Sequence, residues 1–139
     1  MKTILLVGSR GMLGTDLGKL LSSKEDVTLV EVDLPELDIT DREAVETFVE
    51  KSKPDVVVNC AAWTDVDGAE SHADEAFAVN AEGAGNLAAA AETHGAKMVH
   101  VSTDFVFDGT KKGAYVEDDE PNPTSVYGES KFTGERMVI

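Results

Sequence analysis

Short apolar runs alternate with amphipathic segments along the whole chain. An apolar run bounded by glycine, proline or charged residues is typical of a strand buried in a parallel sheet. Apolar residues three and four positions apart indicate a helix instead. We therefore expect strands near residues 3–7, 27–32, 37–39, 55–62 and 97–102. Helices are expected near residues 12–22, 40–51, 72–93 and 125–139. This order predicts an α/β fold, a doubly wound parallel sheet of Rossmann-like type, in one domain over residues 1–139.

Helix boundaries are marked by polar residues. Thr40 with Glu43, and Ser71 with Asp74, have the spacing of a capping box and are expected to open two of the helices. Gly95 is a suitable residue to end the long helix before it. Asn80 is the polar exception in the middle of that helix, and the sequence leaves open whether it is a buried anchor or an exposed side chain.

Three glycines follow the first strand directly and lead into the first helix. Gly8, Gly11 and Gly14 are spaced three apart. Such a turn lets backbone N–H groups approach a ligand, and the helix N-terminus adds the positive end of its dipole. The turn therefore predicts a phosphate site, although an ordinary strand–helix turn that happens to contain glycine is the alternative.

Other features fall at the carboxyl ends of the predicted strands, where sheets of this type bind ligands. Asp33 lies 19 positions after Gly14, which suits a carboxylate that contacts the adenosine ribose of a dinucleotide. A solvated acid is the alternative for Asp33. Ala61 and Ala62 are small enough to let a planar ligand approach the backbone, and Ser102 and Thr103 end the last strand. Together these positions favour a dinucleotide crevice.

The last helix carries a pair suited to proton transfer. Tyr127 and Lys131 are four residues apart and share a helix face. A neighbouring ammonium favours the phenolate and brings the tyrosine pKa closer to neutrality. With a hydroxyl from Thr103 or Ser102 to align a carbonyl, the pair would protonate the alkoxide formed when a hydride reaches a ketone. A chance pair on an exposed helix is the alternative.

Composition narrows the class of protein. The chain has 139 residues, with 12 Lys and Arg against 27 Asp and Glu, for a net charge of −15. Such a surface repels nucleic acid and anionic membranes, so neither is expected as a partner. The single cysteine, Cys60, and the absence of a predicted leader or spanning segment favour a reducing cytoplasm. The histidines lack ligand spacing, so no metal site is predicted.

The motifs in combination resemble the extended short-chain dehydrogenase/reductases. They are the glycine turn at 8–14, the strand-end Asp33, Asn59-Cys60-Ala61-Ala62, Val101-Ser102-Thr103-Asp104 and Tyr127-x-x-x-Lys131. Within that group the likeness is strongest to the dTDP-4-dehydrorhamnose reductase family, through residues 63–70, 102–109 and 123–135. This resemblance implies NADPH- or NADH-dependent reduction of the 4-keto group of a dTDP-sugar.

The resemblance also implies roles for individual residues. Gly11, Met12 and Leu13 would contact the pyrophosphate, and Gly8 and Gly14 would also belong to the cofactor site. Thr103 and Asp104 would contact the nucleotide-sugar substrate. Tyr127 would donate the proton, Lys131 would hold the nicotinamide ribose and tune Tyr127, and Thr103 would polarise the keto group. The residues themselves leave the choice of cofactor open, because Asp33 favours a free 2′-hydroxyl and so NADH, whereas Arg10 could favour the 2′-phosphate of NADPH. The remaining cofactor contacts implied are Asp38, Ile39, Ala61, Ala62, Trp63 and Thr64.

Members of this family are considerably longer than this chain. We therefore expect its N-terminal cofactor-binding portion, or a shortened relative, with most of the substrate pocket lying elsewhere. An unpaired sheet edge would then lead to a homodimer or to an unstable chain. Two other functions stay open: a non-catalytic dinucleotide-binding or regulatory module, and another nucleotide-sugar epimerase or dehydratase.

Overall fold

A four-stranded parallel sheet forms the centre of the computed structural model, which describes residues 1–139. The strands are β1 (Lys2–Val7), β2 (Val27–Val32), β3 (Val56–Asn59) and β4 (Lys97–His100), in the order β2-β1-β3-β4. In the register, Val7 lies opposite both Val32 and Asn59, and Asn59 lies opposite His100. All four strands therefore end level with one another, and the residues that follow them meet at one edge of the sheet.

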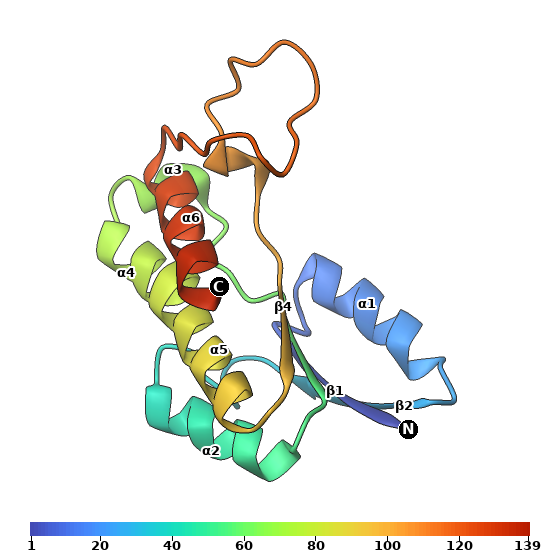
Figure 1. Ribbon diagram of the computed structural model, residues 1–139. Coiled ribbons are helices and arrows are strands. Elements are labelled where there is room, and N and C mark those ends of the chain that lie inside the picture. The colour runs from blue at the N-terminus through green and yellow to red at the C-terminus, as the bar shows by residue number, and fades with distance from the viewer.

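Helices cover both faces of the sheet, as the doubly wound prediction requires (Figure 1). Helix α1 (Met12–Ser22) lies alone on one face, and α2 (Arg42–Ser52) and α5 (Ala84–Thr93) lie on the other. Helix α6 (Val126–Val138) packs against α5 and ends the chain. The shorter elements are α3 (Val66–Ala69), α4 (Ala73–Phe77), the π-helical turn η1 (Ala78–Gly83) and the 3₁₀ turn η2 (Asp104–Val106).

The main hydrophobic core lies between the sheet and helices α2 and α5. Sheet residues Leu5, Val7 and Val57 are fully or almost fully buried there. Val45 and Val49 of α2 and Leu87, Ala90 and Ala91 of α5 complete the same cluster. The apolar residues whose spacing predicted these two helices therefore form the face that each helix presents to the sheet.

Helix α1 packs differently, because its fully buried residues are glycines and its leucines are at most half-buried. Gly14 and Gly18 are its buried residues. A Cβ atom at Gly14 would lie only 2.1 Å from the carbonyl oxygen of Gly8, so no larger residue fits there. Met12 is 92% exposed. The apolar residue at the start of the helix is thus available to a ligand instead of being part of the core.

The short strand predicted at residues 37–39 is wrong. The segment is a turn, and β2 is the edge of the sheet with no strand beyond it. Leu37 and Ile39 are nonetheless 4% and 5% exposed, because both side chains enter the main core. Between them, Asp38 Oδ1 accepts hydrogen bonds from the backbone N and hydroxyl of Thr40. The apolar–polar–apolar alternation reflects burial in a folded loop and not strand pairing.

Both predicted capping boxes are wrong in detail. Helix α2 is capped by Asp41, whose Oδ1 accepts from the Ala44 amide, because Thr40 is already bonded to Asp38. Helix α4 begins after His72 without any side-chain cap. The predicted helix over 72–93 is present, but it is interrupted by the π-helical turn η1. It ends as predicted before Gly95, whose φ of +72° suits glycine.

Helix α6 and the preceding loop follow the prediction. Ser125 caps α6 by accepting from the Gly128 amide at 3.0 Å. Residues 107–124 form a long loop that projects from the body of the molecule (Figure 1). Asp108 organises this loop by accepting from Thr110, Tyr115 and Asn122.

Candidate functional site

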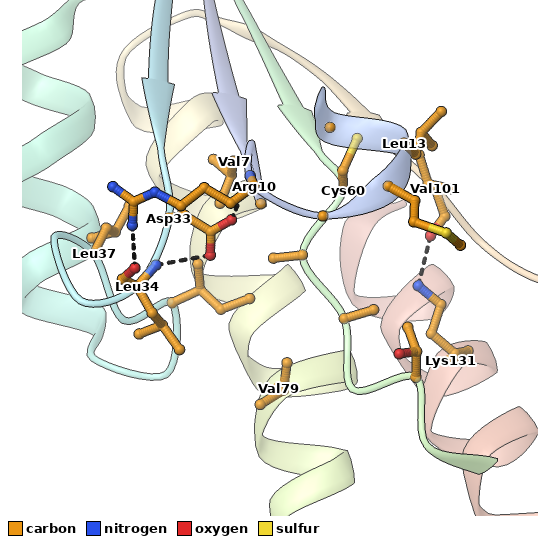
Figure 2. Close-up of a pocket in the computed structure, with 18 of the residues that line it drawn as sticks. Val7, Arg10, Leu13, Asp33, Leu34, Leu37, Cys60, Val79, Val101 and Lys131 are labelled. Atoms are coloured by element: carbon orange, nitrogen blue, oxygen red, sulfur yellow. Dashed lines mark hydrogen bonds between the residues drawn. The ribbon is translucent and has the colours of Figure 1, made fainter. Parts of the chain in front are cut away.

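A cleft of about 650 Å³ opens at the carboxyl edge of the sheet (Figure 2). It runs from the glycine turn and the end of β2, past the end of β3, to helix α6. Because the strands end level, these segments face one another although they are far apart in sequence. The lining residues are Val7, Gly8, Arg10, Gly11, Met12, Leu13, Gly14, Asp33, Leu34, Leu37, Asp38, Ile39, Cys60, Ala61, Ala62, Thr64, Val79, Val101, Ser102, Tyr127 and Lys131.

The three glycines of the turn have different physical roles. Gly8 has a φ of +76°, and a Cβ there would lie 2.5 Å from the Ala61 amide of the neighbouring strand end. Gly14 allows α1 to approach the turn closely. Gly11 is exposed, and a Cβ there would meet only the Gly8 oxygen at 3.4 Å, so its surroundings are open. A ligand can therefore approach the backbone at Gly11.

The first turn of α1 is suited to an anion. Gly11 is the N-cap and supplies no side chain to bond the free amides, and the first turn contains no carboxylate. The amides of Met12 and Leu13 have no partner in the protein. Unpaired N–H groups at the positive end of a helix dipole bind phosphate groups well. The fold thus fits a dinucleotide pyrophosphate at this point.

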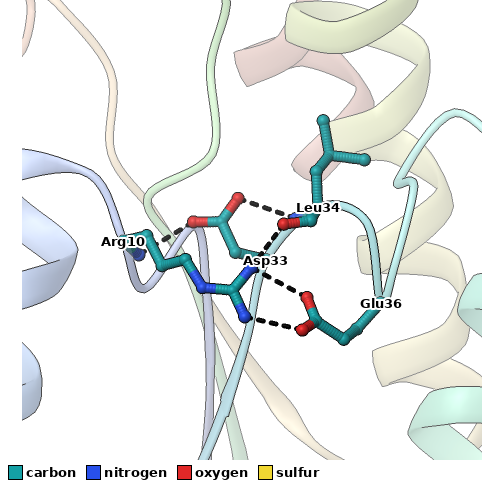
Figure 3. Close-up of polar contacts among 4 residues, drawn as sticks. All are labelled: Arg10, Asp33, Leu34 and Glu36. Carbon is teal, nitrogen blue, oxygen red and sulfur yellow. Dashed lines mark hydrogen bonds and ion pairs between the residues drawn. The ribbon is translucent and has the colours of Figure 1, made fainter.

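Asp33 and Arg10 lie together at the β2 end of the cleft (Figure 3). Asp33 accepts from the Arg10 amide through Oδ2 and from the Leu34 amide through Oδ1, both at 2.8 Å. The Arg10 guanidinium forms a two-pronged ion pair with Glu36 and also donates to the Leu34 carbonyl. The Glu36 hydrogen bond and charge raise the pKa of Arg10, and the same hydrogen bond lowers the pKa of Glu36.

Tyr127 and Lys131 line the opposite end of the cleft. Lys131 is 2% exposed, and its Nζ donates to the Val101 carbonyl at 2.6 Å (Figure 2). Burial lowers the pKa of Lys131, and the charge of Glu135 opposes that shift. Tyr127 is half-buried and packs edge-on against Phe105, with ring centroids 5.5 Å apart. The pair therefore combines a buried cation with a phenol at one wall.

Two neighbours of Lys131 complete this end of the cleft. Ser102 Oγ donates to Glu135 Oε1, which fixes the strand end to helix α6. Cys60 lines the cleft, and burial raises the pKa of its thiol despite the charge of Lys131. The cysteine is consequently held as an uncharged, space-filling group.

Asn80 is a buried anchor, which resolves the alternative that the sequence left open. It is 1% exposed. Its Oδ1 accepts from the Trp63 amide at 2.8 Å, and its Nδ2 donates to the Trp63 carbonyl at 3.1 Å and to Ser130 Oγ at 2.9 Å. One side chain in the π-helical turn thereby ties the segment leading to Thr64 to the helix that carries Tyr127 and Lys131.

Three residues predicted for the site do not line the cleft. The Trp63 ring stacks on His72 at 5.9 Å, and its Nε1 donates to the Asp65 carbonyl. Thr103 Oγ1 accepts from the Phe105 amide and caps η2, and Asp104 is exposed within that turn. Trp63 and Thr103 directly follow residues that do line it, Ala62 and Ser102, and Asp104 lies one position further along the chain.

Several apolar lining residues were not predicted from the sequence. Leu34, Leu37, Val79 and Val101 form part of the wall. Their sequence signal, an apolar side chain near a strand end or in a helix, is the same as that of core residues. Only the level strand ends and the π-helical turn place them at the cleft.

No group of three or more His, Cys, Asp or Glu side chains is arranged to hold a metal ion. None of the helices combines the length and the apolar character required to cross a membrane.

The sequence matches a known protein family over its whole length. A family model described as the RmlD substrate binding domain matches residues 1–139. The chain belongs to this family. A dTDP-4-dehydrorhamnose reductase from Aggregatibacter actinomycetemcomitans is 43% identical over 139 residues, which are 100% of this chain and 47% of the relative. The chain thus spans about half the length of the curated relatives it matches.

Solved structures of the family agree in fold. A dTDP-4-dehydrorhamnose reductase from Clostridium acetobutylicum is 46% identical with a TM-score of 0.95, over 98% of this chain and 48% of that one. The Bacillus anthracis dTDP-4-dehydrorhamnose reductase, solved in complex with NADP, is 39% identical with a TM-score of 0.96, over 99% and 48%. The Rossmann-like fold and the likeness to nicotinamide-dependent reductases are therefore confirmed.

Proposed function

We propose that this chain binds NADPH or NADH in the cleft and forms the cofactor half of a nucleotide-sugar ketoreductase. The observation that carries the proposal is the convergence of the glycine turn, Asp33 and the Tyr127/Lys131 pair on one cleft. The pyrophosphate would contact the Met12 and Leu13 amides, and the adenosine ribose would lie beside Asp33. The relative from Bacillus anthracis solved with NADP supports this choice of cofactor class.

The reaction we propose is reduction of the 4-keto group of dTDP-4-dehydro-L-rhamnose in the cytoplasm. The reduced nicotinamide supplies the hydride when it is bound. Tyr127 donates its phenolic proton to the resulting alkoxide. Lys131, held by the Val101 carbonyl, places a positive charge at the same wall and stabilises the phenolate. Thr103 would polarise the keto oxygen and Asp104 would contact the sugar, once Thr103 exchanges its cap of η2 for the substrate.

A binding test separates the cofactor site from other functions of the fold. Titrating the chain with NADPH and NADH, and following the fluorescence of the reduced nicotinamide, should give saturable binding. Asp33→Ala should weaken NADH binding, because Asp33 is the carboxylate at the ribose end. Failure of both cofactors to bind would remove the proposal.

A catalytic test decides between a reductase and a binding module. Oxidation of NADPH is followed by its absorbance after addition of dTDP-4-dehydro-L-rhamnose, with Tyr127→Phe as the matched control. Turnover that Tyr127→Phe abolishes supports the reductase. Binding without turnover favours the second candidate, a non-catalytic dinucleotide-binding module. The observation that favours this candidate is that Thr103 and Asp104 lie outside the cleft. An epimerase or dehydratase would instead convert a nucleotide sugar without net NADPH oxidation.

We also propose that the chain self-associates through β4. This strand pairs only with β3, so its outer edge is unpaired, and Val99 on it is 50% exposed. Unprotected edge strands pair readily with other chains. Light scattering should detect a dimer, and Val99→Lys should shift it toward the monomer. A monomer at all concentrations would contradict this arrangement.

A further inference from the structure

The ion pair between Arg10 and Glu36 lies at the rim of the cleft, beside Asp33 (Figure 3). Arg10 Nη1 lies 2.9 Å from Glu36 Oε2, and Nη2 lies 2.6 Å from Oε1. Nη1 also donates to the Leu34 carbonyl. The turn that presents Glu36 is closed by the Leu37 amide, which donates to the Asp33 carbonyl at 3.1 Å. The guanidinium is therefore held by the segment that directly follows Asp33.

Glu36 lies outside the cleft that Arg10 enters. Arg10, Asp33 and Leu34 line the cleft, whereas Glu36 lines a separate depression beside helix α2. The bonds to Glu36 thus direct the guanidinium away from the position of a ligand next to Asp33. They also supply the arginine with a carboxylate that neutralises its charge.

These contacts matter because the two nicotinamide cofactors differ at this position. NADH presents a free ribose 2′-hydroxyl, which a carboxylate such as Asp33 accepts as a hydrogen-bond donor. NADPH presents a 2′-phosphate, which an arginine recognises best through two parallel N–H bonds. Glu36 already accepts hydrogen bonds from both terminal nitrogens of Arg10, Nη1 and Nη2. A 2′-phosphate must therefore displace Glu36 before it can bind Arg10 in the same way.

We propose that Glu36 is a specificity-determining residue that restrains Arg10 and so lowers the affinity of the site for NADPH relative to NADH. The inference rests on the proposed cofactor function. The Arg10 and Glu36 side chains are 59% and 52% exposed, so water weakens the pair. Competition with an exposed ion pair changes an equilibrium by no more than about fivefold. The site consequently accepts both cofactors, with a modest penalty on NADPH that Glu36 imposes.

The test measures dissociation constants for NADH and NADPH with the 139-residue chain and Glu36→Gln. The amide keeps the size of the side chain but releases the arginine. NADPH should bind about three- to fivefold more tightly to this variant, while NADH changes by less than about twofold. Glu43→Gln is the matched control, because it removes the same charge from an exposed position with no bond to Arg10. The control should leave both affinities unchanged.

A second background distinguishes restraint of Arg10 from direct repulsion of the phosphate. In Arg10→Ala the effect of Glu36→Gln on NADPH should disappear, because no arginine is left to release. A gain that persists there, or an unchanged NADPH-to-NADH ratio in Glu36→Gln itself, overturns the inference while NADH binding still supports the cofactor site. Failure of the wild-type chain to bind either cofactor overturns the proposed function and this inference with it. Both side chains are exposed, so neither substitution threatens the fold.

Discussion

Truncating Asn80 should destabilise this protein more than its single side chain suggests. Asn80→Ala removes one acceptor and two donors from a site that is 1% exposed. The Trp63 amide and carbonyl each lose a partner. Ser130 Oγ, by contrast, keeps its bond to the Tyr127 carbonyl at 2.8 Å. The loss therefore falls on the backbone of one residue, Trp63, which lies between the lining residues Ala62 and Thr64.

The magnitude follows from these three bonds. Each buried hydrogen bond contributes about 0.5–1.5 kcal/mol net, and a buried backbone group left without a partner costs about 1–3 kcal/mol. We expect the free energy of unfolding to fall by about 2–4 kcal/mol, a large part of the 5–15 kcal/mol typical of a small domain. Affinity for NADPH should fall as well, because Trp63 precedes Thr64, which lines the cleft.

Urea denaturation followed by far-UV circular dichroism measures this change by linear extrapolation. Asn86→Ala is the matched control, because Asn86 donates one bond, to the Ile39 carbonyl at 3.0 Å, from a half-buried position. The control should lose only about 1 kcal/mol. If the two variants differ by less than about 0.5 kcal/mol, Asn80 is not the anchor that its contacts indicate.

Three further results are expected. Gly14→Ala should lose about 1–3 kcal/mol of stability in the same urea assay, because its Cβ would lie 2.1 Å from the Gly8 oxygen. Gly11→Ala, in contrast, should fold normally and bind NADPH less tightly. Equal stability of the two variants would contradict this packing. Burial, together with the charge of Lys131, lowers the pKa of His100 to about 4. The neutral imidazole therefore stabilises the fold at pH values above the unfolded pKa of about 6.5, and this contribution to stability is lost as the pH falls toward 4. Stability should therefore drop by about 2 kcal/mol more in the wild type than in His100→Gln between about pH 7.5 and pH 5, and parallel pH profiles would exclude this effect. Added NaCl should raise the melting temperature, because salt screens the repulsion within a chain of net charge −15, and a melting temperature independent of salt would show that this repulsion is unimportant.

Local pattern was sufficient to predict most of the secondary structure. The helix at 12–22 and the strand at 27–32 are confirmed residue for residue, because their boundaries are marked by glycine, charge and β-branched residues in the segment itself. The glycine turn, Asp33 and the Tyr127/Lys131 pair were also identified from spacing alone, and the structure places all of them on one cleft. Parallel strands bring their carboxyl ends to one edge, so the alternation of elements already implied this meeting.

Other features depend on contacts between segments that are distant in sequence. The apolar–polar–apolar alternation at residues 37–39 would be the same in a strand and in a buried loop. The segment is a loop because it does not pair with β2, which is the edge strand of the sheet. Asn80 is an anchor because Trp63 and Ser130, 17 and 50 positions away, come within hydrogen-bond distance. Arg10 is held at the rim by Glu36, 26 positions along the chain. Local periodicity and strand direction thus define which elements form and which residues meet at the sheet edge, and both can be predicted from the order of the residues. Which polar side chains are restrained there depends on packing, because a hydrogen bond requires positions that only contacts between distant segments define.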